Sequence, residues 1–277
     1  MEKIIFFVEK KEIIDYLNVI LSNQIKKLAY FVCDIEAFME IYTDKSLVIC
    51  NSEAIYKKMT YEGYSITFWE YEPGNRCLSA SYVIQNIDEL EVKDYEYFYN
   101  RLNKLPCEIL RTNRLIIRET TVADVDEFLN LYADPAITMY MEDLFEPDEE
   151  REYQRNYIKN VYEFYDIGIW SVILKNSENI GERIIGRIGI EMTQEEGVVE
   201  MGYMLGTAYQ HNGYAIEAAR AIVQYANSLP GVNVIRAKMH IDNQASIRLC
   251  QKLGMKRVEN SEDKDMMVFE IGLRKEK

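Results

Sequence analysis

The first hundred residues alternate short apolar runs with stretches of helical spacing, and this alternation constrains the fold more than any other feature. The apolar runs are residues 28–33, 46–50, 64–69 and 80–84, and helical patterns occupy 36–42, 52–62 and 94–102. Short apolar runs such as 28–33 and 46–50 are typical of parallel strands that are buried on both faces. Helices between them supply the crossovers that a parallel sheet needs. The sequence therefore predicts a small parallel α/β domain over residues 1–108.

The pattern changes at Arg114, after a boundary segment from Leu105 to Asn113. Strands are expected at 115–119, 168–174, 184–190, 198–205, 234–241 and 266–273, and helices at 121–132, 214–228 and 243–253. A polar turn between the third and fourth of these strands favours antiparallel pairing. We predict a second domain over residues 112–275, a mixed sheet with helices on its faces, so that the whole chain is of the α/β class.

Composition narrows the classes of function. Five cysteines form no close pair and leave one over, and only two histidines are present, so we expect free thiols and no metal site. No run of about 18 uncharged apolar residues occurs, and the acidic start does not resemble a signal peptide, so we expect a cytoplasmic protein without a membrane partner. The net charge of −14 weighs against a nucleic-acid partner and fits a cationic or neutral substrate, although acidity also serves solubility.

A polar turn centred on Gly213 lies between the strand ending near Leu205 and the helix beginning near Tyr214. A helix N-terminus carries unpaired N–H groups that bind anions, and glycine lets the backbone approach a ligand closely. The turn lacks the Lys-Ser/Thr of a triphosphate loop and the three glycines of a dinucleotide fingerprint. It therefore predicts a phosphate site, with an ordinary strand-to-helix loop as the alternative.

Three motifs occur in order around this turn. They are Glu200-Met-Gly-Tyr-Met-Leu205, Gln210-x-x-Gly213-x-Ala215-x-Glu217-Ala218 and Asn243-Gln-Ala-Ser246-Ile-Arg248-Leu-Cys-Gln-Lys-Leu-Gly254-Met255. Together they closely resemble the GNAT N-acetyltransferase superfamily, most nearly its ribosomal-protein alanine N-acetyltransferase branch. The opening Arg114-Leu-Ile-Ile-Arg118 and Asp134-Pro135 fit that branch, and the resemblance covers about residues 112–275.

The resemblance implies a mostly antiparallel GNAT sheet that binds acetyl-CoA as cosubstrate without a metal. The pantetheine arm would pair with the strand at Met204 to Gly206, where it splays from the next strand, and the Leu205 N–H would stabilise the oxyanion. Asn243 would contact the arm, cap its own helix, or do both. The residues expected to contact the cosubstrate are Met204, Leu205, Gly206, Gln210, His211, Asn212, Gly213, Tyr214, Ala215, Asn243, Ser246 and Arg248.

The resemblance also implies acetyl transfer to a primary amine by direct attack in a ternary complex. Family members place a tyrosine acid on the last helix, and this chain has Cys250 at that position, so Cys250 is either the acid or a buried core thiol. Glu200 and His240 are the candidate bases, because they lie on the two strands beside the cleft. His240 packed at a strand end, Glu200 acting through water or anchoring the sheet, and catalysis without a base are the alternatives.

The acceptor side is predicted from the acidic segment 140–152, which contains Tyr140, Glu142 and Asp143. An acidic mouth attracts a small cationic amine or a peptide N-terminus, whereas acids at a helix start also favour the helix dipole alone. A homodimer is compatible with the sequence. A non-catalytic acyl-CoA sensor or interaction module is the rival interpretation, since Cys250 replaces the family's tyrosine.

The first domain faintly resembles part of a haloacid-dehalogenase-like domain, in the run Ser46-Leu-Val-Ile-Cys-Asn51-Ser52 and the strands that follow. That family has an aspartate where Asn51 stands and an Asp-x-Asp nucleophile earlier. Here Cys33-Asp34-Ile35-Glu36 offers one aspartate without its partner. We therefore predict a degenerate, non-catalytic α/β module over residues 1–108.

Overall fold

The computed structural model describes residues 1–8, 10–175, 183–259 and 263–273. The chain forms two compact units, Met1–Cys107 and Glu108–Lys277. Within the predicted range 112–275, residues 176–182, 260–262 and 274–275 lie outside the described residues. None of the described helices is long and apolar enough to cross a membrane.

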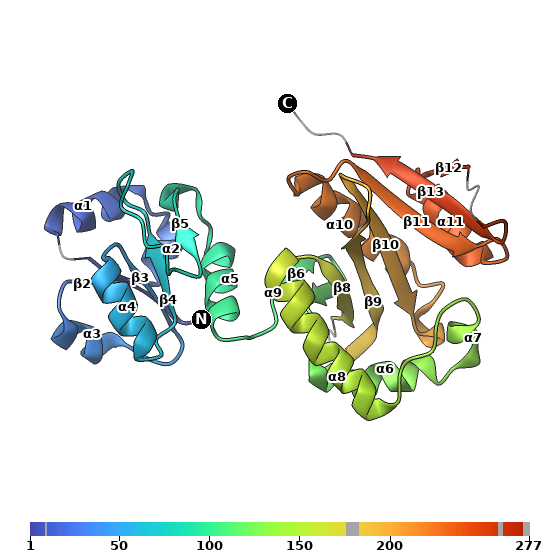
Figure 1. Ribbon diagram of the computed structural model, residues 1–277, viewed down its shortest axis with the longest axis horizontal. Helices are drawn as coiled ribbons and strands as arrows, with labels where there is room; N and C mark the ends of the chain where they lie inside the picture. Colours follow the sequence, from blue (N-terminus) through green and yellow to red (C-terminus); the bar gives the residue numbers. More distant parts are fainter. Residues whose placement is uncertain (9, 176–182, 260–262, 274–277) are drawn as a thin grey trace. The chain divides into compact units, whose positions relative to one another are not determined.

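The first unit is a parallel sheet with helices on both faces (Figure 1). The strand order is β2-β1-β3-β4-β5, and neighbouring strands run parallel, as predicted. Its strands are β1 (Lys3–Phe7), β2 (Ala29–Val32), β3 (Ser46–Cys50), β4 (Ile66–Trp69) and β5 (Val83–Ile84). Its helices are α1 (Lys11–Ile20), α2 (Asn23–Lys26), α3 (Ile35–Ile41), α4 (Glu53–Tyr61), η1 (Ile87–Glu89) and α5 (Val92–Leu102).

Strand β1 explains why the apolar runs of this unit are continuous. Ile4 and Phe6 belong to the core on one face of the sheet, and Ile5 and Phe7 belong to the core on the other. Successive strand residues point to opposite faces, so a strand covered on both faces needs apolar residues throughout. Sequence analysis did not identify β1, α1 or α2, because the opening residues were considered only as a possible leader.

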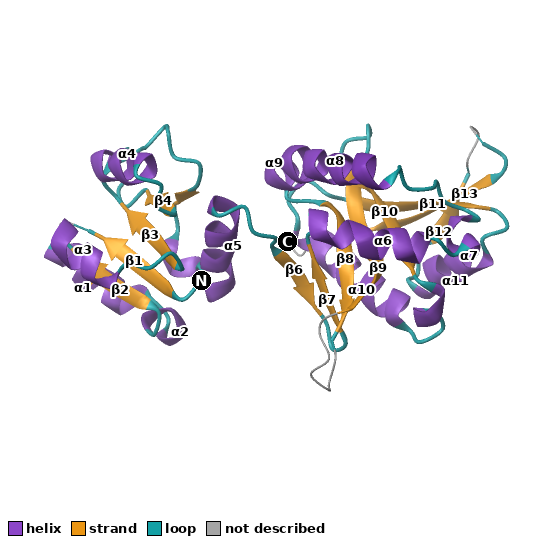
Figure 2. Ribbon diagram, turned by 90° about the horizontal axis from the view of Figure 1, so that it is seen from below, coloured by secondary structure: helices purple, strands orange, loops and turns teal. Residues whose placement is uncertain are grey.

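The second unit is a larger mixed sheet in the order β12-β13-β11-β10-β9-β8-β7-β6, with helices on both sides (Figure 2). Its strands are β6 (Glu108–Arg111), β7 (Leu115–Arg118), β8 (Gly168–Leu174), β9 (Arg183–Met192), β10 (Val198–Leu205), β11 (Val234–His240), β12 (Lys256–Val258) and β13 (Met266–Gly272). Its helices are η2 (Val122–Asp124), α6 (Val125–Tyr132), α7 (Pro135–Thr138), α8 (Pro147–Tyr157), the π-helix η3 (Ile158–Tyr162), α9 (Glu163–Tyr165), η4 (Thr207–Tyr209), α10 (Tyr214–Ser228) and α11 (Gln244–Lys252).

The paired strands of this sheet run antiparallel except β10 and β11, which are parallel. The mixed, mostly antiparallel sheet expected from the resemblance is thus confirmed. One core contains residues of α10 and α11, and a second core contains residues of α6 and α7, including Phe128 and Ile137. Adjacent β10 residues divide between these cores, since Leu205 belongs to the first and Met204 to the second. The two groups of helices therefore cover opposite faces of the sheet.

A buried ion pair joins β7 to the start of α6. Arg118 donates to both carboxylate oxygens of Asp124, at 2.6 and 2.9 Å, and the Thr121 N–H donates to Asp124 at 2.7 Å. Burial alone would raise the pKa of Asp124, but the hydrogen bonds from Arg118 and Thr121 outweigh it and lower that pKa. This network fixes the chain where it leaves the sheet.

Candidate functional site

Strands β10 and β11 pair for only part of their length. The parallel pairing joins Val198–Glu200 to Val234–Arg236 and then ends, although β10 continues to Leu205 and β11 to His240. Beyond Glu200, no described strand pairs with the β11 side of β10. We call this side of Met201–Leu205 the open edge of β10. It is the splay that the resemblance implies, and it leaves backbone groups available to a ligand.

The direction of the backbone along the open edge follows from one hydrogen bond. The Gly206 N–H donates to the Ile185 carbonyl oxygen of β9 at 2.9 Å. Backbone groups of successive strand residues alternate in direction, so the Leu205 N–H points to the open edge. Met204 and Gly206 were also expected to offer backbone groups there. The Gly206 N–H is used by β9 and the Met204 carbonyl lies against Gly186, so contacts of these two residues with the cosubstrate stay predictions.

The turn between β10 and α10 holds its backbone in unusual conformations. His211 has φ +61° and Gly213 has φ +79°, in the left-handed region that disfavours side chains. The Gln210 side chain donates to the Leu205 carbonyl oxygen at 3.0 Å, which ties the turn to the open edge. Gly213 occupies the N-cap and supplies no side chain to cap the helix, so first-turn N–H groups of α10 remain open to an anion.

Arg114 braces this turn from the start of β7. Its Nη1 donates to the Asn212 carbonyl oxygen at 3.0 Å, and its guanidinium stacks over the Tyr214 ring at 4.5 Å. Its Nε also donates to Glu217 Oε2 at 2.7 Å. The glutamate in the turn motif therefore holds Arg114 against the turn, a role that sequence analysis did not assign.

Helix α11 begins beside the open edge with Asn243 at its N-cap. The Asn243 side chain accepts a hydrogen bond from the Ser246 N–H at 3.1 Å. Its capping role is therefore observed, and a ligand contact remains a prediction. Arg248 is exposed on the same helix.

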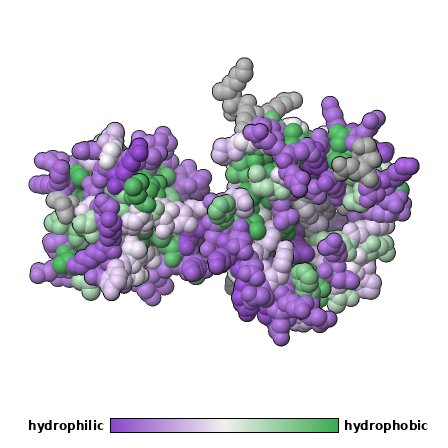
Figure 3. Space-filling view, in the orientation of Figure 1, coloured by the Kyte–Doolittle hydropathy of each residue, from purple (hydrophilic) through white to green (hydrophobic). Residues whose placement is uncertain are grey.

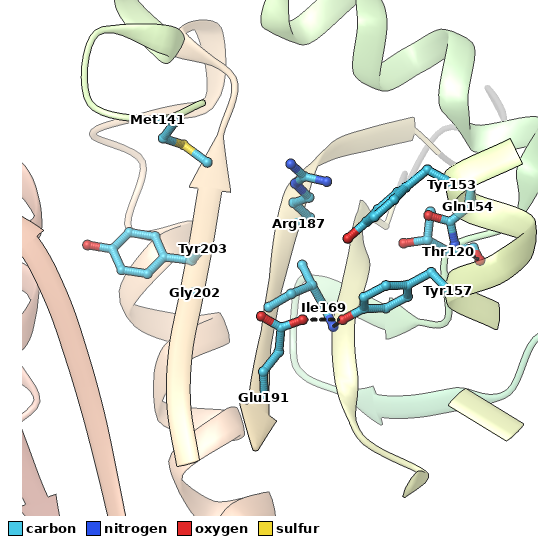
Figure 4. Close-up of a pocket in the computed structure, with 10 residues that line it drawn as sticks. All are labelled: Thr120, Met141, Tyr153, Gln154, Tyr157, Ile169, Arg187, Glu191, Gly202 and Tyr203. Atoms are coloured by element: carbon cyan, nitrogen blue, oxygen red, sulfur yellow. Dashed lines mark hydrogen bonds between the residues drawn. The ribbon is translucent and has the colours of Figure 1, made fainter. Parts of the chain in front are cut away.

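Tyr203 is a candidate that sequence analysis missed. Its hydroxyl is buried and has no hydrogen-bond partner among the described residues. Burial raises the pKa of Tyr203, and the nearby Cys250 thiol raises it further. The Ser246 hydroxyl lies close enough to lower this pKa, but its geometry is not that of a hydrogen bond. Figure 4 shows the Tyr203 ring extending from β10 away from β9. The Tyr203 side chain thus brings a hydroxyl close to Ser246 and Cys250 of α11.

Cys250 itself lies in the core between α11 and the sheet. Its side chain is fully buried, and burial raises the pKa of the thiol to about 11. The structure thus shows the buried state that sequence analysis weighed against an acid role. No disulfide joins any two of the five cysteines.

A pocket of about 240 Å³ lies on the face of the sheet that α8 covers (Figure 4). Tyr157 Oη donates to Glu191 Oε1 at 2.6 Å and accepts from the Ile169 N–H at 3.0 Å, so both side chains are fixed. Its lining residues are Thr120, Met141, Tyr153, Gln154, Tyr157, Ile169, Arg187, Glu191, Gly202 and Tyr203. A signal for it was present in the sequence, since Arg187 and Glu191 are charged residues on one face of an apolar strand.

The pocket reaches the open edge of β10. Gly202 and Tyr203 both line it, and both belong to the stretch Met201–Leu205 that forms the open edge. The edge toward β9 is closed by pairing that continues to Leu205 opposite Gly186. Residues of the stretch of β10 that β11 leaves unpaired therefore border the pocket.

The predicted acceptor and base residues are only partly brought together. Tyr140 stacks on the His240 ring at 5.5 Å and donates to the Asp242 carbonyl oxygen at 3.4 Å, and its neighbour Met141 lines the pocket. Glu142 and Asp143 are exposed and do not line it. Polar side chains also cover the outer face of α8 (Figure 3).

Glu200 and His240 lie at different levels of the site. Glu200 stands where the pairing of β10 and β11 ends, and its carboxylate pairs with Lys238 at 3.3 Å. His240 ends β11 four residues after Arg236, the partner of Glu200, which is about 13 Å along a strand. His240 is therefore the candidate base that lies closer to Leu205 along the strands. Glu200 lies where β10 and β11 are still paired, and it forms an ion pair with Lys238.

In the first unit, Asp34 and Asn51, the residues compared with a phosphatase site, make hydrogen bonds within the fold. The Asp34 carboxylate accepts from the Ala37 N–H at 2.8 Å as the cap of α3, and the Asn51 carbonyl accepts from the Asn75 side chain at 2.8 Å. The described residues contain no group of three or more His, Cys, Asp or Glu side chains placed to hold a metal. The haloacid-dehalogenase resemblance stays a prediction.

Comparison with known proteins identifies the second unit. The family profile described as "Acetyltransferase (GNAT) domain" matches residues 114–256. The uncharacterized N-acetyltransferase p20 of Bacillus licheniformis is 30% identical over 154 residues, which are 54% of this chain and 83% of that protein. The uncharacterized N-acetyltransferase YoaA of Bacillus subtilis strain 168 is 29% identical over 153 residues, which are 54% of this chain and 83% of that protein.

A solved structure agrees at the level of the fold. The ribosomal L7/L12 alpha-N-protein acetyltransferase RimL, in complex with coenzyme A, matches with a TM-score of 0.52 at 14% identity. The match covers 60% of this chain and 98% of RimL. The profile match spans more than half of the sequence, and the motifs, the splayed strands and these relatives agree with it. We conclude that this chain belongs to the GNAT family and is an N-acetyltransferase.

Proposed function

We propose that the second unit transfers the acetyl group of acetyl-CoA to a primary amine by direct attack in a ternary complex. The observation that carries this proposal is the open edge of β10, which presents the Leu205 N–H next to a turn ending at an uncapped helix start. The pantetheine arm would pair with the open edge as an additional strand. The pyrophosphate would bind at the turn, through backbone groups of Gln210 to Ala215.

The acceptor amine would enter through the pocket beneath α8, which Gly202 and Tyr203 of the same stretch of β10 line. Holding amine and thioester together supplies much of the rate acceleration before any side chain acts. The amine nitrogen attacks the thioester carbonyl carbon, and the Leu205 N–H stabilises the oxygen as it becomes negative. His240 is the proposed base for the amine proton, directly or through water.

The C–S bond then breaks, and the thiolate takes a proton. We assign this proton to the Tyr203 hydroxyl, because it is buried, unpartnered and close to Ser246 and Cys250. Its pKa is raised, so the hydroxyl stays protonated at neutral pH. Cys250 is then a core residue beside the acid.

A non-catalytic acyl-CoA sensor is the competing function, and turnover separates the two. A thiol-release assay with acetyl-CoA and a panel of amines, amino acids and peptides tests transfer, while calorimetry measures CoA binding. Amine-dependent thiol release supports the transferase. CoA binding without release by any acceptor would favour the sensor. The Gly213→Val variant should lose CoA binding under both functions, which shows that the binding measured is at the turn.

A further inference from the structure

Arg187 is the unusual residue of the acceptor pocket. It lies on β9, and its guanidinium stacks on the Phe128 ring at 5.6 Å and on the Tyr132 ring at 4.9 Å. Its Nη2 donates to Tyr132 Oη. These contacts fix the direction of the side chain and do not neutralise its charge, because a phenol is neutral at physiological pH.

No carboxylate of the described residues forms an ion pair with Arg187. The two candidates nearby have other partners. Glu191 accepts from Tyr157 at 2.6 Å, and the buried Glu150 accepts from the Phe145 N–H at 3.2 Å. In a chain with a net charge of −14, a partly buried guanidinium without a counter-ion needs an explanation. A ligand that brings the anion supplies one.

A second hydrogen-bond donor faces the same space. Tyr153 lines the pocket, and its hydroxyl has no hydrogen-bond partner among the described residues. Burial raises the pKa of Tyr153, the Glu191 carboxylate adds to this, and the nearby Arg187 guanidinium opposes it. Figure 4 shows the Tyr153 hydroxyl and the Arg187 guanidinium on the same side of the pocket, with Glu191 further along β9. A guanidinium with an adjacent hydroxyl is a suitable partner for a carboxylate or phosphate.

The register of the sheet places this pair close to the reaction. Arg187 lies opposite Met204, one residue before Leu205, whereas Glu191 lies opposite Glu200, at the narrow end of the splay. An anionic group held by Arg187 would therefore lie near the amine that attacks at Leu205. A purely cationic polyamine would instead place positive charge against Arg187, which is unfavourable in a pocket partly shielded from water.

We propose that the acceptor is a small amine that carries its own anionic group near the nitrogen, with Arg187 and Tyr153 binding that group. Amino acids and amines bearing a phosphate share this chemistry. The proposal rests on the proposed function and refines it, because the acidic chain alone had suggested a cationic acceptor. Arg187 thereby determines specificity, and the amine is acetylated at the open edge of β10.

The test compares matched acceptors in the thiol-release assay with the full chain. Each amino acid is paired with its amide and its decarboxylated amine, and phosphoethanolamine is paired with ethanolamine, so that carboxylate and phosphate are separated. Hydrogen bonds to a charged group predict that kcat/KM of the wild type is about 10-fold to 100-fold higher for the anionic member of a pair. The Arg187→Gln variant should lose this preference, and Arg187→Lys should retain part of it. Arg155→Gln, on the exposed side of α8, is the matched control.

Each outcome decides something. Preference for anionic acceptors that disappears in Arg187→Gln supports the proposal, whichever anion is used. Thiol release with neutral or cationic amines at equal rates, or with peptides only, overturns the proposal and leaves the transferase intact. CoA binding without release by any acceptor overturns both. If Arg187→Gln does not fold, the wild-type comparison and Arg187→Lys still decide.

Discussion

Replacing Tyr203 by phenylalanine should raise stability and lower turnover, and this opposite pair of effects is the sharpest test of the site. The Tyr203 hydroxyl is buried without a hydrogen-bond partner among the described residues. Leaving a buried polar group unpaired costs about 1–3 kcal/mol. Tyr203→Phe removes that cost and keeps the ring, so the free energy of unfolding of the second unit should rise by about 1 kcal/mol.

In a unit of this size, 1 kcal/mol raises Tm by roughly 2–4 °C. A positioned general acid contributes about 10²-fold to 10⁴-fold in rate. We expect the lower end, because a thiolate is a better leaving group than an alkoxide. The variant should therefore lose about 10²-fold in kcat with little change in KM, since the hydroxyl acts on the departing sulfur and not on substrate binding.

Calorimetric unfolding gives the stability change, and initial rates of thiol release give kcat and KM. Tyr95→Phe is the matched control. The Tyr95 hydroxyl is likewise buried without a partner, but it lies on α5 in the first unit. This variant should stabilise the first unit to a similar degree and leave kcat unchanged.

The reasoning about Tyr203 fails if Tyr203→Phe lowers Tm and leaves kcat at the wild-type value. That result would mean that the hydroxyl makes a structural hydrogen bond to Ser246. A rise in Tm without a loss of kcat would show an unpaired hydroxyl with no part in the chemistry. The proton would then come from water or from another group beside the sulfur.

Three further predictions concern the turn, the ion pair and the buried thiol. Gly213→Val forces a β-branched residue to φ +79° and fills the approach to α10, so Kd for CoA by calorimetry should rise more than about 10-fold. Asp124→Asn breaks a buried pair and should cost about 3–5 kcal/mol of unfolding free energy at pH 7. Because the pKa of Asp124 is lowered by folding, this contribution is present above its unfolded pKa of 3.8 and is lost as pH falls through the folded value. The stabilities of wild type and variant should therefore converge in acid, and a difference that stays constant with pH would contradict this. Cys250→Ala should keep kcat within about 3-fold and lose about 1 kcal/mol of stability by chemical unfolding, whereas loss of turnover in a folded variant would restore Cys250 as the acid.

The fold was largely predictable from the sequence because each unit has a pattern with few solutions. Short apolar runs such as Leu47-Val-Ile-Cys50 are typical of strands buried on both faces, and this indicated the parallel unit. Short edge elements were missed for a physical reason. Strand β12 is only Lys256–Val258 and has two exposed residues, so it lacks the apolar alternation that identifies a strand.

The turn was predictable because its backbone conformation depends on local sequence, above all on Gly213, and the splay of β10 was implied by the family resemblance. The acceptor pocket was not, because its residues come from α8, β8, β9 and β10, and only the register of the sheet brings them together. Tyr203 belongs to the first sequence motif but was assigned no role, since a sequence does not show which hydroxyl lacks a hydrogen-bond partner in the fold. The prediction of a cationic acceptor rested on the acidic segment 140–152, whose burial a sequence does not show. Its charges are visible in the sequence, but Glu142 and Asp143 face solvent.

The open edge of β10 also has a consequence for stability. A strand edge inside a sheet normally pairs its N–H and carbonyl groups, and leaving them unpaired is unfavourable. On the proposed function the pantetheine arm completes this edge, so CoA should stabilise the second unit by RT ln(1 + [CoA]/Kd), about 2.7 kcal/mol at 100 times Kd. The first unit should show no such increase unless the two units unfold together. Thermal unfolding with and without CoA therefore reports both where CoA binds and whether the units unfold together. A rise in Tm confined to one transition would show that the units unfold independently and that CoA binds one of them, whereas a common rise would show that they unfold as one.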